Sequence, residues 1–580
     1  MISNYSVVLL VIILLILTLV LSRLRPIVIF LFVTGILYLL NVISFETVSS
    51  CFSNPSLVTL VALILVSVPL ERIGVISRFC NYVVSSDSMP RFNIFRLGLL
   101  AGLSSSILSN TAVVSTIMSG LRTQRNINLS ALLLPLSYSS IAGGMITLVG
   151  TSTNLIINSF IDQASLQPLS FFDFTLIGLP VFFVTLLTLS LLSTSVLSKR
   201  KLANHKQIRT EYLFERRVIE GSNLIGRSVS ENGLRRLQNI FLVEVMRNTQ
   251  TFTPVTPDFV IAQGDVLAFS GDPAFESILN RFDGLVFQAA QSHKSSPLVQ
   301  VVISPSSALV GQTLKDSDFR SCFDAAVISI RRGSHNVRGR LGHHLLAPGD
   351  SLLLAVGPKF VASTKSGRDF VAVQGIERHE PLSALKSSAL MIGFLAVLVG
   401  AALELLPLIK GLMILLSACV LFGLVKLSEL KARFPFEIIV VVAGALCLSE
   451  AMVNVGMTED LSQWLQGLMA PLSYTTALVL VYFAAWATTE LITNNAAAAL
   501  MFPISLATAD AMQASPYPFF MALAFGASAS FLSPYGYQTN LMVYSAGNYR
   551  LSDYLKCGLP ILIAYSATAL IVIPLVFPFS

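Results

Sequence analysis

The sequence predicts a polytopic α-helical membrane protein built from two inverted repeats, with a cytoplasmic α+β module inserted between them. Hydrophobic residues make up 54% of the 580 residues and charged residues only 12%, which is too few charges for a water-exposed surface. Two short polar motifs recur in the same order in both halves of the chain, each inside apolar sequence. The central residues 199–381 instead carry the charges and Gly-Asp turns of a soluble domain.

The recurring motifs are a polar tip and a glycine-led loop. Residues 109–111 and 150–154 form the pair in the first half, and residues 493–495 and 536–540 form the pair in the second. A bilayer core offers no water to polar groups, so uncharged polar clusters at that depth line a cavity or bind a ligand. Paired clusters in corresponding positions of two halves are typical of a secondary transporter whose site lies between its repeats.

The first repeat covers residues 1–198. Apolar runs long enough to cross a bilayer of about 30 Å begin near Tyr5, Pro26 and Leu57. Basic residues follow the first and the third run, which places those ends in the cytoplasm and the amino terminus outside. A further span is expected at residues 171–197.

Two interrupted segments lie between these spans. Residues 93–125 have basic residues at both ends and the polar tip in the middle, which predicts a re-entrant hairpin from the cytoplasmic side. Residues 129–160 are interrupted by glycines and by the loop 150–154, which predicts a broken helix.

The inserted module contains a repeat of its own, which divides it into residues 199–285 and 286–381. Three pairs of matching positions have the same offset of 85: Gly226 and Gly311, Arg247 and Arg332, Asp265 and Asp350. The pattern resembles the carboxy-terminal ligand-binding domain of regulators of potassium conductance. This resemblance implies tandem domains that sense a small-molecule effector; the alternative is a purely structural dimerisation block.

The second repeat covers residues 382–580. Expected spans cover residues 382–402, 409–425, 435–448 and 559–577, with a basic loop at 426–433, a hairpin at 472–512 and a broken helix at 519–547. Five spans per half is an odd number, so the second half is inverted relative to the first. Its hairpin therefore enters from the outside.

The polar motifs supply the oxygens that sodium prefers, about five or six per ion. One cage is expected from Asn110 with the loop 150–154, and the other from 493–495 with the loop 536–540. Half-helices that start at the tips would direct their positive dipole ends at an anion. The candidate binding residues are Ser109, Asn110, Thr111, Gly150, Thr151, Thr153, Asn154, Thr493, Asn494, Asn495, Gly536, Thr539 and Asn540.

Glu490 lies one helical turn before Asn494. An intramembrane carboxylate is by default a functional residue, here a proton or sodium contact. The alternative is a glutamate that is hydrogen-bonded to backbone or to the neighbouring Thr488 and Thr489. The six cysteines have no metal-type spacing and are expected to be buried apolar side chains that form no disulfides.

The paired motifs resemble those of the divalent anion/sodium symporter family, which carries sulfate in some members and di- or tricarboxylates in others. The resemblance covers both membrane repeats and implies that residues 109–111 contact both sodium and substrate. In the second signature Asn495 replaces the family's threonine, which argues against carboxylate recognition. Members with a tandem cytoplasmic insert resemble the sulfate-related branch, so sulfate or a similar oxyanion is expected.

The same resemblance implies an elevator-like homodimer in the bacterial inner membrane, with sodium as the coupling ion and no cofactor. The net charge of +7 is expected from basic loops and calls for no nucleic acid. The closer alternative is a sodium-coupled di- or tricarboxylate symporter. A cation channel gated by the cytoplasmic domains is more remote, because residues 534–537 occur once whereas a filter needs four copies. No constellation of residues predicts an enzyme.

Overall fold

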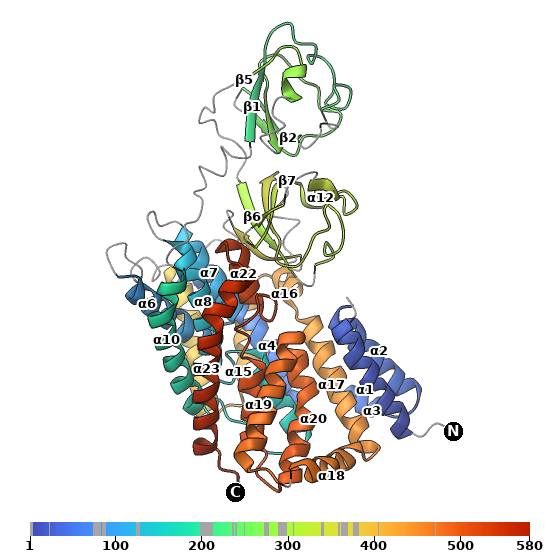
Figure 1. Ribbon diagram of the computed structural model, residues 1–580, viewed down its shortest axis with the longest axis vertical. Coiled ribbons are helices and arrows are strands. Elements are labelled where there is room, and N and C mark those ends of the chain that lie inside the picture. The colour runs from blue at the N-terminus through green and yellow to red at the C-terminus, as the bar shows by residue number, and fades with distance from the viewer. Residues whose placement is uncertain are drawn as a thin grey trace. The chain divides into compact units, whose positions relative to one another are not determined.

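The computed structural model describes residues 4–21, 24–73, 83, 89–122, 128–197, 213–234, 237, 240–248, 250–271, 278–287, 298–304, 307–333, 335–337, 341–357, 360, 369–374, 382–403, 405–469 and 471–580. The chain divides into two compact units (Figure 1). The helical unit comprises Met1–Lys199, Pro381–Asn540 and Leu551–Ser580. The strand-containing unit comprises Arg200–Glu380 with Leu541–Arg550.

The first half of the helical unit consists of helices, several of which begin at a proline or at a capping side chain. Its α-helices are α1 (Asn4–Leu21), α2 (Pro26–Leu39), α3 (Phe45–Phe52), α4 (Pro55–Leu70), α6 (Pro90–Ser105), α7 (Asn110–Arg122), α8 (Leu129–Gly144), α9 (Ser152–Gln163) and α10 (Thr175–Leu197). Before α4, Oδ1 of Asn54 accepts hydrogen bonds from the N–H groups of Ser56 and Leu57. These bonds satisfy backbone donors that a helix start leaves unpaired.

The second half has the same kind of helices. They are α14 (Ala384–Ala402), α15 (Leu408–Leu421), α16 (Leu427–Arg433), α17 (Phe436–Asn454), α18 (Met457–Met469), α19 (Tyr474–Leu491), α20 (Asn494–Met512), α21 (Tyr517–Ala527), α22 (Gln538–Ala546) and α23 (Leu551–Val576). The expected basic loop at 426–433 is wrong in one respect, because it contains the short helix α16. The sequence pattern also did not predict α18, because its acidic first turn and its polar residues are unlike those of an apolar span.

The halves of the helical unit are packed into each other. Helix α10 packs along α23, α17 along α2, and α20 against α9, so helices far apart in sequence lie side by side (Figure 1). Among the described residues, four helical segments are long and apolar enough to cross a membrane: Phe45–Ile73, Thr175–Leu192, Phe436–Asn454 and Leu551–Val576. Several further apolar helices of 10–17 residues accompany them.

The strand-containing unit holds two five-stranded sheets of the same topology. The first has the order β3-β2-β4-β1-β5 and the second β10-β6-β9-β7-β8. The strands are β1 (Leu213–Val218), β2 (Ile240–Arg247), β3 (Gln250–Phe252), β4 (Val266–Gly271), β5 (Leu285–Phe287), β6 (Leu298–Ile303), β7 (Ala325–Arg332), β8 (His335–Asn336), β9 (Ser351–Val356) and β10 (Phe370–Gln374). Each strand of the second sheet begins 85 positions after its counterpart in the first.

Each sheet also contains an equivalent ion pair between an arginine and a buried aspartate. Arg247 donates to both carboxylate oxygens of Asp265 at 2.8 Å, and Arg332 donates in the same way to Asp350 at 2.7 Å. Both aspartates are fully buried and also accept a backbone N–H, from Ala262 and from Ala347. The paired carboxylates fix the turn before β4 and β9, which explains the repeated Gly-Asp sequence.

The cysteines depart from expectation at one position. Cys51, Cys419, Cys447 and Cys557 are buried, whereas Cys322 is exposed. Cys322 lies in the short helix α12 (Phe319–Phe323) of the strand-containing unit, where the sheet core already takes the neighbouring Phe319 and Phe323. Cys80 lies outside the described residues.

Candidate functional site

All four polar motifs lie at helix starts. Asn110 begins α7 and Asn494 begins α20, while α9 begins directly after Thr151 and α22 directly after Tyr537. The side chains of Ser109 and Thr493 cap the two tip helices, each accepting an N–H three residues on at 3.4 Å. Four positive helix ends therefore accompany the uncharged polar side chains.

The asparagines of the motifs are held in equivalent ways in the two halves. At the tips, Oδ1 of Asn110 accepts from the hydroxyl of Ser105, and Oδ1 of Asn494 accepts from Thr489, in each case five residues earlier. In the loops, Nδ2 of Asn154 donates to the carbonyl of Thr147 at 3.1 Å. Likewise, Nδ2 of Asn540 donates to the carbonyl of Ser533 at 3.2 Å, again seven residues earlier.

Side-chain hydrogen bonds join the tip of each half to the loop of the other. Asn110 Nδ2 donates to the hydroxyl of Tyr537 at 2.6 Å, and the hydroxyl of Thr111 donates to Oε1 of Gln538 at 3.3 Å. The hydroxyl of Ser152 donates to Oδ1 of Asn495 at 2.9 Å. The structure thus brings motifs that are almost 430 positions apart in sequence into one cluster.

Three buried polar atoms in this cluster have no hydrogen-bond partner. They are Oγ1 of Thr153, Oδ1 of Asn154 and Nδ2 of Asn494. The first two are oxygens of the kind that coordinate sodium, and the third is a donor of the kind that binds an anion. A buried polar group without a partner lowers the stability of the fold by about 1–3 kcal/mol. A ligand that hydrogen-bonds to or coordinates these three atoms would remove that cost.

The loop of the second half makes more side-chain hydrogen bonds to a neighbouring helix than the loop of the first half. The hydroxyl of Ser137 in α8 bonds to Thr539 Oγ1 at 2.9 Å and donates to Asn540 Oδ1 at 2.8 Å. The corresponding atoms of the first half are those of Thr153 and Asn154 that lack partners. The two loops are therefore similar in sequence but unequal in their free oxygens.

The two loop glycines differ in how closely they are packed. A Cβ added to Gly150 would lie 2.4 Å from the carbonyl oxygen of Gly144, so no side chain fits there. At Gly536 the nearest atoms would be those of Ser530 at 3.2 Å, with Oε2 of Glu490 at 3.5 Å. Glycine is therefore required at Gly150 by close backbone approach, and Gly536 lies beside the carboxylate of Glu490.

Glu490 lies at the end of α19 and faces the break between α21 and α22. Its Oε1 accepts the backbone N–H of Leu532 at 3.4 Å. Thr488 and Thr489 bond elsewhere, to the carbonyl of Ala484 and to Asn494. Glu490 is thus bound to backbone, and its second oxygen points toward the loop at Gly536.

Tyr537, Gln538 and Ser152 belong to the cluster and lie in the predicted loops, although they are not among the candidate binding residues; Ser137 belongs to it from outside the motifs. The available signal was alignment of the two loops, which pairs Tyr537 with Thr151 and Gln538 with Ser152. Ser137 has no such signal, because it lies in an apolar helix and contacts the loop only through the fold.

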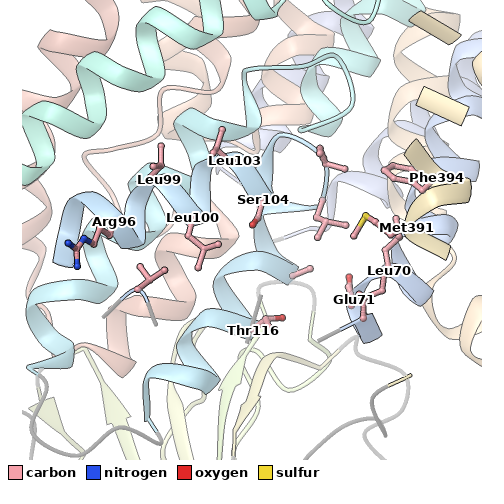
Figure 2. A pocket seen from close by; sticks show the side chains of 15 residues that line it. Leu70, Glu71, Arg96, Leu99, Leu100, Leu103, Ser104, Thr116, Met391 and Phe394 are labelled. Atoms are coloured by element: carbon pink, nitrogen blue, oxygen red, sulfur yellow. The ribbon is translucent and has the colours of Figure 1, made fainter. Parts of the chain in front are cut away.

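An apolar cavity of about 490 Å³ lies beside the first hairpin (Figure 2). Leu108 and Ala112, which flank the tip, line it together with residues of both hairpin helices. In Figure 2, Leu70, Met391 and Phe394 stand across the cavity from Leu100 and Leu103 of α6. Residues of both hairpin helices therefore border this apolar cavity.

Comparison with known proteins gives the family. The sequence model of the citrate transporter family matches residues 10–526 of this chain. An uncharacterized transporter of Synechocystis is 32% identical over 555 residues, which are 91% of this chain and 89% of the relative. A Chlamydomonas reinhardtii protein whose name links it to the response to sulfur deprivation is 29% identical over 565 residues, 93% of this chain and 96% of the relative.

Sodium/sulfate cotransporter 1 of Chlamydomonas reinhardtii is 29% identical over 372 residues. The match takes in 60% of this chain and 41% of that protein. The family is one of membrane transporters, not of enzymes, which agrees with the apolar helices and the buried polar cluster. With its helical unit, its polar helix starts and a match over residues 10–526, the chain belongs to the citrate transporter family.

Proposed function

We propose that this protein is a secondary active transporter that couples sodium to the uptake of a small divalent anion, sulfate or a similar oxyanion. The observation that carries the proposal is the meeting of four uncharged polar helix starts, joined across the two halves by the bonds of Asn110, Thr111 and Ser152. Positive helix ends attract an anion without a buried Arg or Lys. The free oxygens of Thr153 and Asn154 would hold the sodium.

Sulfate is favoured over other small dianions by two observations. Relatives of this chain are named as sodium/sulfate cotransporters, with 28–29% identity over 60% of the chain. Asn495 stands where a threonine is expected for carboxylate recognition, and its amide oxygen is taken by Ser152. The sodium in those names supports sodium as the coupling ion.

The proposed mechanism is elevator-like alternating access in a homodimer of the bacterial inner membrane. Two inverted repeats of five spans, each with a hairpin and a broken helix, would carry the site between them. The equivalent bonds of Asn110 and Asn494, and of Asn154 and Asn540, support this repeat. The tandem sheets would act as regulatory domains for a small-molecule effector, supported by their common strand order and ion pairs.

The test is uptake of radiolabelled sulfate and succinate into proteoliposomes with an inward sodium gradient. We expect sulfate uptake that disappears when potassium replaces sodium and when Asn110 is changed to alanine. Sodium-independent uptake, or none of either anion, contradicts the proposal.

A sodium-coupled di- or tricarboxylate symporter is the second candidate, because the matching family is described as that of citrate transporters. In the same experiment, uptake of succinate or citrate in place of sulfate would select this candidate. The roles of the tip asparagines and loop oxygens would stay the same.

A further inference from the structure

One difference between the two halves of the polar cluster lies at the tip asparagines. Thr111 bonds to Gln538, and Asn495 bonds to Ser152. These two contacts are equivalent, because position 111 matches position 495 in the repeat and position 538 matches position 152. The residues one position earlier in each tip and each loop form two further equivalent pairs, Asn110 with Tyr537 and Asn494 with Thr151. Only the first of these exists among the described hydrogen bonds.

The two loops carry different side chains at this position. Tyr537 spans the distance to Asn110 with its ring and places its hydroxyl 2.6 Å from the amide nitrogen. Thr151 instead forms a side-chain hydrogen bond with Tyr537, and Nδ2 of Asn494 is left buried without a protein partner. Asn494 is 7% exposed, and a buried polar group is normally hydrogen-bonded.

The two ends of the site are therefore unequal. At the Asn110 end both amide atoms are satisfied by protein, Oδ1 by Ser105 and Nδ2 by Tyr537. At the Asn494 end Oδ1 is satisfied by Thr489, but the N–H donors of Nδ2 are free at the positive start of α20. An anionic oxygen is the ligand that this donor and this helix start would bind.

We propose that Tyr537 determines the substrate class: it occupies the Asn110 end of the site, so the transporter accepts compact oxyanions with one charged head and excludes two-headed dicarboxylates. This inference rests on the proposed function and deepens it. A dicarboxylate needs donors at both ends of its site, and at the Asn110 end the Tyr537 hydroxyl already lies against the amide nitrogen. A tetrahedral oxyanion needs only one end, which the amide nitrogen of Asn494 leaves open.

The test replaces Tyr537 with threonine, the residue that stands at the equivalent position 151. Uptake of radiolabelled sulfate and succinate is measured in proteoliposomes, and kcat/KM is compared for the two anions. We expect Tyr537→Thr to shift the succinate-to-sulfate ratio by about tenfold or more toward succinate, a change of about 1.4 kcal/mol in discrimination. Tyr537→Phe keeps the ring in place and is expected to keep the preference for sulfate.

The matched control is Tyr535→Thr, because Tyr535 is 59% exposed and two positions away on the same loop. Both Tyr537 variants are checked for monodispersity and melting temperature. If Tyr537→Thr does not fold, the anion preference of Tyr537→Phe is the test, and a loss of its preference for sulfate contradicts the role of the ring.

The outcomes separate the two proposals. Sodium-dependent sulfate uptake by the unaltered protein, with an unchanged anion ratio in Tyr537→Thr, overturns the role of Tyr537 and leaves the transport function standing. An unaltered protein that already transports succinate as well as sulfate also overturns it. No sodium-dependent uptake of any anion overturns the proposed function, and the Tyr537 proposal falls with it.

Discussion

The amide nitrogen of Asn110 donates a hydrogen bond to the hydroxyl of Tyr537 across 2.6 Å, although 427 positions of sequence separate the two residues. Asn110 begins α7 and Tyr537 directly precedes α22, so this bond joins two helix starts. It also joins the two halves of the chain within the polar cluster.

Alanine substitutions of the two tip asparagines, Asn110 and Asn494, are expected to have different effects on transport and stability. Asn494→Ala removes the free N–H donors, so we expect the KM for sulfate to rise at least about tenfold, an effect of about 1.4 kcal/mol. Asn110→Ala removes a side chain that is already satisfied by protein, so its main expected effect is a lower melting temperature together with lost uptake. Uptake kinetics and thermal unfolding of the purified protein check both.

Ser119→Ala is the control for these variants, because Ser119 lies exposed on α7 and bonds only to the carbonyl of Ser115 among its described contacts. Equal KM values in Asn494→Ala and the unaltered protein would remove Asn494 from the anion site.

Thr153 and Thr539 give a matched pair for the sodium site. Thr153 Oγ1 has no protein partner, so Thr153→Val is expected to leave stability unchanged but to raise the half-saturating sodium concentration about tenfold. Thr539 bonds to Ser137, so Thr539→Val is expected to lower the free energy of unfolding by about 1 kcal/mol. Sodium titration of uptake and denaturant unfolding distinguish the two. A sodium dependence that is the same in Thr153→Val and the unaltered protein places the ion elsewhere.

The apolar cavity behind the first hairpin offers a test of movement. Thr116 lines the cavity on α7, so Thr116→Trp is expected to fill part of its 490 Å³ and to restrict the hairpin. Binding itself does not need that space, so we expect sulfate-induced thermal stabilisation to persist while the uptake rate falls about fivefold or more. Ser119→Trp adds the same ring on the exposed side of α7 and serves as control. Uptake that is equally fast in both variants argues against movement of this hairpin into the cavity.

A carboxylate in the first sheet domain gives a pH prediction. The backbone N–H of Ser228 donates to Glu231 at 2.7 Å, and this bond, with the Ser228 side chain, lowers the pKa of Glu231 from its ordinary 4.5. A carboxyl whose pKa is lower in the folded state stabilises that state above its ordinary pKa, and the contribution is lost as the pH falls through the lowered value. We therefore expect hydrogen exchange of residues 227–233, corrected for intrinsic rates, to stay slow at pH 5–7 and to increase below pH 4.5.

Glu231→Gln is expected to show the faster exchange already at pH 7, because an amide is a weaker acceptor for the N–H of Ser228. Glu220→Gln, at an exposed position in the preceding loop, is the control. If the exchange of Glu231→Gln matches that of the unaltered protein at pH 7, the carboxylate does not hold this turn.

The sequence was a good guide wherever one chemical rule acts along a continuous segment. Length and apolarity located many of the helices, and the glycine-led loops marked the breaks before α9 and α22. The strands of the two sheets have the same offset of 85 as the residue pairs in the sequence. It failed for α16 and α18, because short polar helices depend on packing against neighbouring helices more than on apolarity.

The sequence by itself determined that Asn110, Asn154, Asn494 and Asn540 are the special residues, since amides inside apolar sequence need partners or ligands. Only the tertiary structure decided which partners they have. Hydrogen bonds depend on distance and direction in space, and Tyr537 reaches Asn110 only because the fold brings the two halves together. For the same reason only the fold leaves the amide of Asn494 buried and free, and this difference between equivalent residues is what points to the anion.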